Sequence, residues 1–397
     1  MDFPMHRFLG LCAALLMLYA APLAHAEVAP ELAVAVNVHH VAKDLWRVDY
    51  RFAQAVTAIK FRSIGEFRQQ EWKVLTHGMD MKSESGQDVI ASNGEPFQSA
   101  SVQIRTFDGW SPKEYVSFNR FGDGGTAVYL GHLQGAVQQG KKVLFMRPEF
   151  KLFGLAQENV IAPPNNSFGQ LEERGYAYFG LAQAANAGAV QILIDPQTPQ
   201  WLRETILDTS AKVSAYYEKA YQRQLKHELL IMVSVATFDS PGFSMKGGAI
   251  RGQGQVSYRL EGKQLNVDHP KLRDYAARNV AHEMAHIWQL AVSRGGIGEQ
   301  DPWIHEGGAE AMALDALVQS GVASEESSKD YRAKQAAACE KLGGAVDSYD
   351  GIYACGLVRF DKLGVGIVPL WRSMMAAAEA NGDVYSQQMI DTIVSAK

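Results

Sequence analysis

Long apolar runs are almost absent from this chain of 397 residues. The run at the N-terminus, residues 8–20, follows His6-Arg7 and precedes the small-x-small sequence Ala24-His25-Ala26. This order is typical of a secretory signal peptide, because the run is too short to span a bilayer; a retained membrane anchor is the alternative. We therefore expect residues 1–26 to be a signal peptide, no integral membrane segment to remain after cleavage, and the mature protein to be secreted or periplasmic.

Basic clusters are missing as well. The 38 Lys and Arg residues are outnumbered by 43 Asp and Glu residues, which gives a formal net charge of −5. No stripe of positive charge stands out that would follow a phosphate backbone, so we expect no nucleic acid among the partners. Internal repeats and low-complexity tracts are not found either, and the apolar and charged fractions are those of an ordinary globular protein.

Cysteine is scarce, with three residues in the chain, and Cys12 lies inside the predicted signal peptide. Cys339 and Cys355 remain after cleavage. An even number of cysteines in an exported protein favours one disulfide, and two buried free thiols are the alternative. We predict the disulfide between Cys339 and Cys355.

The first part of the mature chain has the pattern of β-strands. Residues 33–38 and 45–52 alternate apolar and polar side chains, as half-buried strands do. Shorter strands are predicted at residues 101–107, 115–118 and 126–130. Several short strands separated by turn-rich stretches favour a β-sandwich, so we predict a β-rich N-terminal domain over residues 27–165.

After residue 165 strands and helices alternate. Buried strands are predicted at residues 190–194 and 229–236, a helix at 199–225 and a further strand, possible at a sheet edge, at 249–260. From Pro270 onward the chain is mostly helical. This order predicts an α+β fold, in which residues 166–397 form a second domain with a helical C-terminal part.

One segment of the second domain carries the residues of a metal centre. His282, Glu283 and His286 form a His-Glu-x-x-His pattern within residues 270–288, a stretch that favours a helix. Residues four apart lie on one face of a helix, so both imidazoles can reach one zinc ion at about 2 Å. Glu283 would face a water molecule at the metal as general base. Taken alone, the motif has an alternative, which is a helix with two core-facing histidines.

A second helical segment supplies a third ligand. Residues 303–310 have the sequence Trp-Ile-His-Glu-Gly-Gly-Ala-Glu, and a glycine-rich turn lies between His286 and Glu306. Two histidines and one glutamate form a catalytic zinc site with one position left to water. We therefore predict Zn²⁺ bound by His282, His286 and Glu306. Glu310, one turn further on, either holds the spare N–H of a ligand histidine or is a solvated carboxylate.

Together these two runs resemble the gluzincin metallopeptidases, of the thermolysin and aminopeptidase N kinds. The second run is similar to the aminopeptidase N pattern Trp-Leu-Asn-Glu-Gly-Phe-Ala-Glu, with His305 in place of the asparagine. The resemblance covers residues 270–320, and the order of a β-rich part and this domain also resembles the glycyl aminopeptidases. It implies a thermolysin-like catalytic domain, zinc, Glu283 as the base, and a peptide or protein substrate.

The same resemblance extends to Tyr353. Residues 353–356, Tyr-Ala-Cys-Gly, are similar to a Tyr-x-x-Gly run that opens a later helix in aminopeptidase N relatives, where the phenol stabilises the oxyanion. A phenol aimed at developing negative charge is what amide hydrolysis needs beside the metal. The resemblance thus implies Tyr353 as a second catalytic residue. Tyr349 is a competing candidate, and a packed tyrosine without a catalytic role is the alternative.

One feature of these relatives is absent. Aminopeptidase N relatives carry a Gly-x-Met-Glu-Asn run before the zinc helix, and its glutamate binds the free amino group of the substrate. The matching stretch here, residues 244–253, has no carboxylate and contains Lys246 and Arg251. We therefore expect a peptidase that is not an ordinary aminopeptidase and that binds extended peptides internally, unless another acidic residue takes that role.

Two other functions fit the same residues. One is an exported protein that binds a peptide or envelope polymer and has a degenerate zinc site. The intact Glu283 argues against it, because a purely structural zinc site has no use for a base. The other is zinc-dependent hydrolysis of a non-peptide bond, which differs only in the substrate and stays open.

Overall fold

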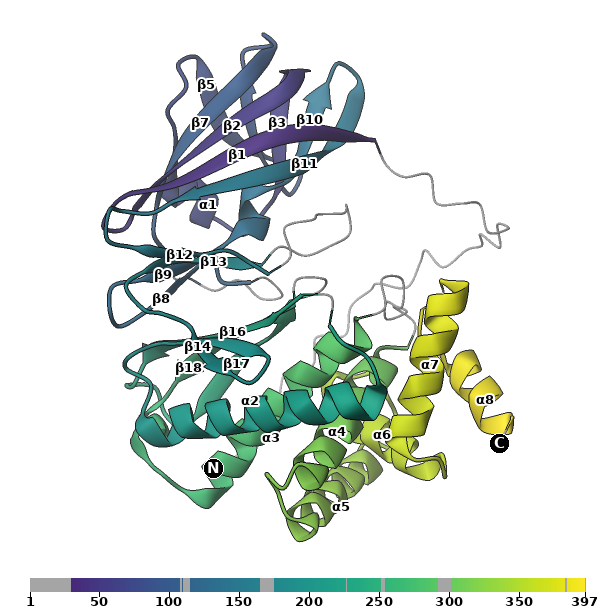
Figure 1. The fold of residues 1–397 in the computed structure, drawn as a ribbon. Coiled ribbons are helices and arrows are strands. Elements are labelled where there is room, and N and C mark those ends of the chain that lie inside the picture. Colours follow the sequence, from purple (N-terminus) through teal and green to yellow (C-terminus); the bar gives the residue numbers. More distant parts are fainter. Residues whose placement is uncertain are drawn as a thin grey trace, which may run out of the picture.

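The computed structural model of the chain describes residues 30–107, 109, 115–164, 175–225, 227–250, 254–291, 301–382 and 384–396. The predicted signal peptide lies outside the described residues. Within them, no helix combines the length and the apolar character needed to cross a membrane. Three β-sheets and a group of helices are stacked one upon another (Figure 1).

The first sheet has nine strands and curls over a single core. In order across the sheet the strands are β4 (Trp72–Val74), β7 (Phe97–Arg105), β2 (Leu45–Val56), β1 (Glu31–Ala42), β11 (Lys142–Phe153), β10 (Ala136–Gln139), β3 (Ala58–Arg62), β6 (Gln87–Ser92) and β5 (Met79–Glu84), and the short helix α1 (Phe67–Glu71) precedes β4. Along β1, buried residues alternate with more exposed ones, as a half-buried strand requires. Trp72 on β4 and Phe61 on β3 bring their ring centroids within 5.5 Å, although their strands lie toward opposite ends of the sheet. The sheet therefore closes on itself like a sandwich.

The second sheet has four strands and lies between two cores. Its strands are β12 (Asn159–Ile161), β13 (Tyr176–Gly180), β9 (Thr126–Tyr129) and β8 (Phe118–Arg120), and the short helix η1 (Leu130–Leu133) follows β9. Every residue of β9 and β13 is buried. Val128 and Phe179 pack into the core of the nine-stranded sheet, whereas Ala127 and Tyr178 pack against the third sheet. β13 follows the predicted domain boundary at residue 165, and the boundary itself lies outside the described residues.

The third sheet has five strands, in the order β14 (Ala185–Ala187), β15 (Val190–Ile194), β16 (Leu229–Thr237), β18 (Gln255–Glu261) and β17 (Ser244–Ile250). β15, β16 and β18 are parallel, and β17 pairs antiparallel with β18 at the edge. The strands predicted at residues 190–194 and 229–236 are confirmed. The strand predicted at 249–260 is confirmed over residues 255–260, where β18 lies, and wrong at its start, because residues 249–250 belong to the separate strand β17. Apolar residues in both strands imitate one continuous strand.

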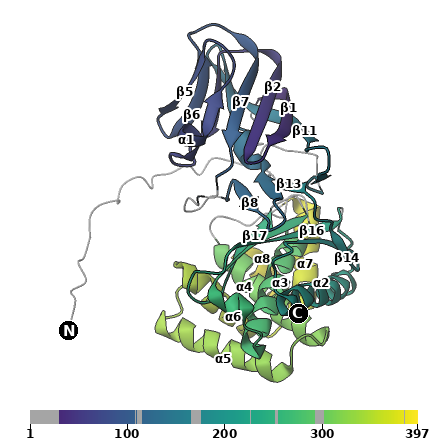
Figure 2. The same ribbon diagram turned by 90° about the vertical axis from the view of Figure 1, so that its left-hand side faces the viewer.

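Helices cover the outer face of the third sheet. They are α2 (Gln200–Tyr221), α3 (Pro270–Gln289), α4 (Pro302–Gln319), α5 (Glu325–Lys341), α6 (Tyr349–Lys362), α7 (Ile367–Asn381) and α8 (Gln387–Ser395), with the short helix η2 (Lys263–Asn266) before α3. α2, α3 and α4 share one apolar core with the strands. Figure 2 shows α5 on the side of the helical layer that faces away from the sheets. This arrangement confirms, at a coarse level, a mixed α and β fold with a helical C-terminal part.

The predicted disulfide is present. Cys339, near the end of α5, is bonded to Cys355 in the middle of α6. Both residues are buried in a small cluster of their own, together with Ala354. The bond therefore attaches α6 to α5 two residues from Tyr353.

Candidate metal centre

The helix α3 presents both predicted histidine ligands. It begins with Pro270 in its first turn, where the missing N–H of proline costs nothing, and the side chain of His269 accepts a hydrogen bond from the Lys271 amide. His282 and His286 lie one turn apart near its C-terminal end, and each is only 5% exposed. The predicted third ligand, Glu306, lies in the first turns of α4. The structure thus places the three residues on two adjacent helices.

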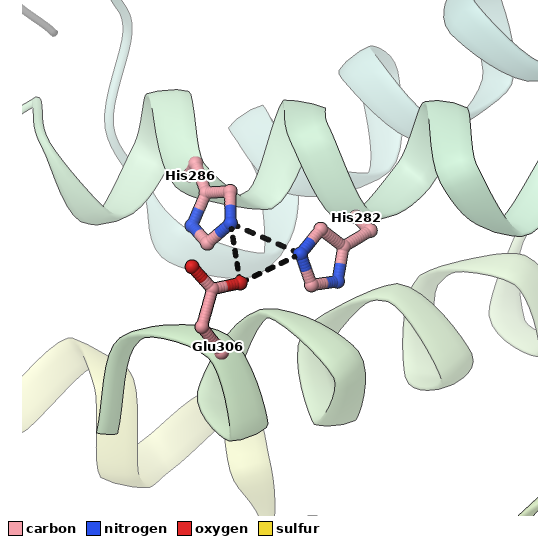
Figure 3. A group of neighbouring side chains, drawn as sticks. All are labelled: His282, His286 and Glu306. Carbon is pink, nitrogen blue, oxygen red and sulfur yellow. Dashed lines mark hydrogen bonds and ion pairs between the residues drawn. The ribbon is translucent and has the colours of Figure 1, made fainter. Parts of the chain in front are cut away.

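The three side chains point toward one another (Figure 3). Nε2 of His282 lies 3.0 Å from Nε2 of His286, and Oε2 of Glu306 lies 3.2 and 3.3 Å from these two nitrogens. Ligand atoms about 2 Å from a zinc ion at tetrahedral angles are roughly 3.3 Å apart. Two imidazole nitrogens and one carboxylate oxygen at these separations therefore fit zinc. Among the described residues, these three form the one group of histidine, cysteine and acidic side chains that lie close enough together to hold a metal ion.

A further carboxylate faces His282 from behind. Oε1 of the buried Glu310, on α4, lies 3.1 Å from Nδ1 of His282. Burial alone would lower the pKa of His282, but the carboxylates of Glu306 and Glu310 outweigh this and raise the pKa well above its usual value. For Glu306, burial would raise the pKa, and hydrogen bonds from both histidines lower it below the usual range. Two buried carboxylates beside two imidazoles form an environment that favours a divalent cation.

The other histidine has a different neighbour, which the sequence pattern did not reveal. Nδ1 of His286 lies 2.8 Å from Oε1 of Gln289, a fully buried residue one turn further along α3. The ring of His305 lies against that of His286, with centroids 3.8 Å apart. The spacing of three residues after a ligand histidine was the available signal, because such residues share a helical face.

The predicted base, Glu283, reaches the edge of the third sheet. Its Oε2 accepts a hydrogen bond of 2.7 Å from the backbone amide of Ala249 on β17. Gly248 lies beside the same oxygen, since a Cβ at that position would be 3.5 Å away. The carboxylate is therefore held between the two histidine ligands on α3 and the edge strand.

Tyr353 lies next to the metal centre. Its ring stacks on His282 with centroids 5.7 Å apart and an interplanar angle of 24°. A close contact of two glycines makes this possible, because a Cβ on Gly307 of α4 would lie 2.3 Å from the carbonyl carbon of Gly356 on α6. Burial, followed by the nearby charge of Glu306, raises the pKa of Tyr353 far above its usual value, so the phenol keeps its proton. Tyr349 lies one turn earlier, with its ring centroid 5.1 Å from that of Tyr353, and is 75% exposed.

The stretch matched to the amino-group-binding run is β17 together with residues outside the described part. Lys246 already has a partner within the protein, because its Nζ binds Oε2 of Glu261 at 2.9 Å. Arg259 binds the other oxygen of the same carboxylate at 3.1 Å. Arg251 lies outside the described residues. The acidic Glu261 on the neighbouring strand is thus already neutralised by two cations.

Comparison with known proteins shows a shared fold. No protein-family model matches the sequence, and no curated protein sequence matches it. Among solved structures, the chain is similar to an aminopeptidase N family protein from Idiomarina loihiensis, with a TM-score of 0.56 and 11% identity over 88% of this chain and 71% of that one. Yeast LTA4 hydrolase aligns with a TM-score of 0.49 and 11% identity over 94% of this chain and 66% of that one. The fold of this chain is therefore of the kind found in the aminopeptidase N family protein.

Proposed function

We propose that this protein is a zinc-dependent hydrolase that cleaves peptide bonds, with the metal on His282, His286 and Glu306. The observation that carries the proposal is the convergence of these three ligand atoms beside Glu283. The resemblance of both helix motifs to gluzincins and the fold shared with an aminopeptidase N family protein support it. In this proposal the second half of the chain is a thermolysin-like catalytic domain.

In the proposed hydrolysis, the metal, Glu283 and Tyr353 each have a separate role. Zinc bound at this site would supply a Lewis acid for the scissile carbonyl and would lower the pKa of water. Glu283 takes a proton from the attacking water and passes it to the leaving amine nitrogen. Its hydrogen bond from Ala249 holds the carboxylate in place between the metal ligands and β17. Tyr353 donates its phenolic proton in a hydrogen bond to the oxygen that becomes negative in the transition state.

The edge strand β17 gives the substrate a place to bind. It is the last strand of its sheet, so an extended peptide can pair with its outer edge. Its seven residues include no carboxylate, and Glu261 beside it is held by Lys246 and Arg259. Among the described residues of β17 and β18, an α-ammonium group finds no carboxylate without a cationic partner. We therefore propose binding of extended peptides along β17 and internal cleavage, in place of removal of N-terminal residues.

The predicted location is part of the same proposal. A signal peptide at residues 1–26 would direct the chain to a secreted or periplasmic place. The disulfide between Cys339 and Cys355 is compatible with an oxidising environment.

The test compares Glu283→Gln with the wild type and with Glu326→Gln, the same exchange at an exposed position of α5. We expect Glu283→Gln to retain one zinc per chain, because no ligand is lost, and to hydrolyse peptides about 10²–10⁴-fold more slowly. Elemental analysis before and after chelation gives the zinc content, and a library of end-blocked and unblocked peptides gives the activity. Undiminished cleavage by Glu283→Gln would contradict the mechanism. Release of single N-terminal residues from unblocked peptides alone would contradict internal cleavage.

A further inference from the structure

The orientation of the Gln289 amide is determined by its two partners. Its Nε2 donates a hydrogen bond of 3.0 Å to the backbone carbonyl of His305, and a carbonyl oxygen only accepts. The NH₂ group must therefore face His305, which leaves Oε1 facing Nδ1 of His286 at 2.8 Å. Because Oε1 in turn only accepts, Nδ1 of His286 carries the hydrogen. Nε2 of His286, the atom beside Glu306, keeps its lone pair for a metal.

We infer that Gln289 is a positioning residue of the metal centre, whose side-chain amide fixes the tautomer and the ring orientation of His286. This inference rests on the zinc site of the proposed function and names a residue that acts on it without touching the metal. Gln289 is fully buried, so water does not compete for its hydrogen bonds.

The same amide connects the two helices that supply the ligands. One of its bonds goes to His286 on α3 and the other to the backbone of His305, the residue before Glu306 on α4. The hydroxyl of Tyr385 donates a hydrogen bond of 2.7 Å to the backbone carbonyl of Gln289, which holds this turn of α3 from the C-terminal side. Rotation of the His286 ring would break the bond within α3, whereas the bond to His305 holds the amide in place from α4.

The two ligand histidines are supported by groups of different charge. Glu310 places a carboxylate behind His282, whereas Gln289 places a neutral amide behind His286. Glu306 and Glu310 together already balance the charge of a divalent cation. A neutral acceptor at position 289 orients the second imidazole without adding a further negative charge to a buried site.

The experiment separates orientation from packing with two variants of Gln289. Gln289→Met keeps the length and the unbranched shape of the side chain and removes the acceptor, and Gln289→Glu keeps an acceptor for Nδ1 of His286. Gln319→Met, at an exposed position of α4, is the control for the exchange itself. Zinc affinity is measured by competition with a chelator, on samples whose folding has been checked by thermal unfolding.

We expect Gln289→Met to bind zinc 10–100-fold more weakly than the wild type, Gln289→Glu to recover most of that loss, and Gln319→Met to bind normally. Should Gln289→Met fail to fold, Gln289→Asn replaces it with the same expected loss, because its shorter side chain moves the oxygen away from Nδ1. Wild-type affinity in the variant without the acceptor would overturn the inference. An equal loss in Gln289→Glu would also overturn it, since an acceptor facing Nδ1 of His286 would then not restore the zinc affinity.

Hydrolysis of peptides is measured on the same samples, so that the two proposals can fail separately. A wild type that binds zinc and cleaves no peptide would contradict the proposed function and leave the zinc affinities to decide the role of Gln289. A wild type that cleaves peptides, with Gln289→Met binding zinc normally, would contradict the role of Gln289 alone. A wild type that binds no zinc would overturn both.

Discussion

At the scale of single residues, two tyrosines of α6 show how position decides chemistry. Tyr353 and Tyr349 lie one turn apart on the same face of the helix, and their rings are in contact. Tyr353 stacks on the predicted metal ligand His282, whereas Tyr349 is mostly exposed to solvent. Of the two candidates that the sequence left open, Tyr353 is the one that lies beside the candidate metal centre, and its proposed role as donor can be tested.

We expect Tyr353→Phe to lower kcat for peptide hydrolysis by about 10²–10³-fold, the usual effect of removing one donor from a developing oxyanion. KM and zinc affinity should change little, because the phenol donates mainly in the transition state and is not a ligand. Tyr349→Phe is the matched control and should retain the wild-type kcat. Steady-state kinetics of the two variants with one blocked peptide make the comparison. Equal losses of kcat in both variants, or a loss only in Tyr349→Phe, would contradict the role proposed for Tyr353.

At the scale of elements, the edge strand β17 depends on two adjacent glycines that are not equivalent. Gly247 has a φ of 152°, and a Cβ there would lie 1.8 Å from the carbonyl oxygen of Ser257 on β18. Gly248 has an ordinary backbone conformation, and its Cβ would make only a van der Waals contact with Glu283. The first glycine is needed for strand pairing, and the second borders Glu283, the predicted base.

We expect Gly247→Ala to lower the free energy of unfolding by about 1–3 kcal/mol, because the backbone of β17 must move away from β18. Activity should fall as well, since the displacement takes the amide of Ala249 away from Glu283. Gly248→Ala should unfold like the wild type. Urea unfolding and peptide hydrolysis of both variants provide the measurement. A Gly247→Ala protein as stable and as active as Gly248→Ala would show that β17 does not hold the base.

The elements differ in how well the sequence predicts them. Long apolar or strongly helical stretches such as β15, β16 and α3 are predicted close to their observed bounds, because burial and helical period leave a clear pattern. The short strands β5 and β10 are not predicted, although each pairs with the strand that follows it, because both are short and largely polar. The strand predicted at residues 115–118 begins only at Phe118, and the strand predicted at 249–260 includes the end of β17 as well as β18.

The residues of the candidate site also differ in how well the sequence predicts them. His282, His286 and Glu306 are predictable, because a metal requires particular residue types at particular spacings. The structure brings them together as that spacing implies, and their role as zinc ligands stays a prediction. Gln289 is not predicted, because many helix residues lie three positions after a histidine, and that spacing alone does not mark a functional amide. The ion pairs of Lys246 and Arg259 with Glu261 also depend on strand register, which one sequence does not specify.

At the scale of the whole molecule, the four-stranded sheet joins the two halves of the chain. One of its faces completes the core of the nine-stranded sheet, and the other packs on the five-stranded sheet. The buried carboxylate of Asp195, after β15, strengthens this connection. It accepts hydrogen bonds of 3.0 Å from the amides of Gly122, after β8, and of Val235, on β16.

We therefore expect the mature chain to unfold in a single cooperative transition, because neither half keeps a complete core without the shared sheet. Differential scanning calorimetry should give a calorimetric enthalpy equal to the van't Hoff enthalpy, with circular dichroism and tryptophan fluorescence following the same curve. Two resolved transitions would instead show that the β-rich part and the helical part fold independently.

The shared sheet also limits how this protein can change over evolutionary time. Ala177 and Tyr178 are neighbours in β13, yet one packs toward the nine-stranded sheet and the other toward the five-stranded sheet. A strand with one face in water can accept substitutions at every second position, but β13 has no such face. A substitution of Ala177 requires compensating changes in the core of the nine-stranded sheet, and a substitution of Tyr178 requires them in the core shared with the five-stranded sheet. The β-rich half and the half with the metal centre are therefore expected to diverge as a pair, each restricting the substitutions that the other can accept.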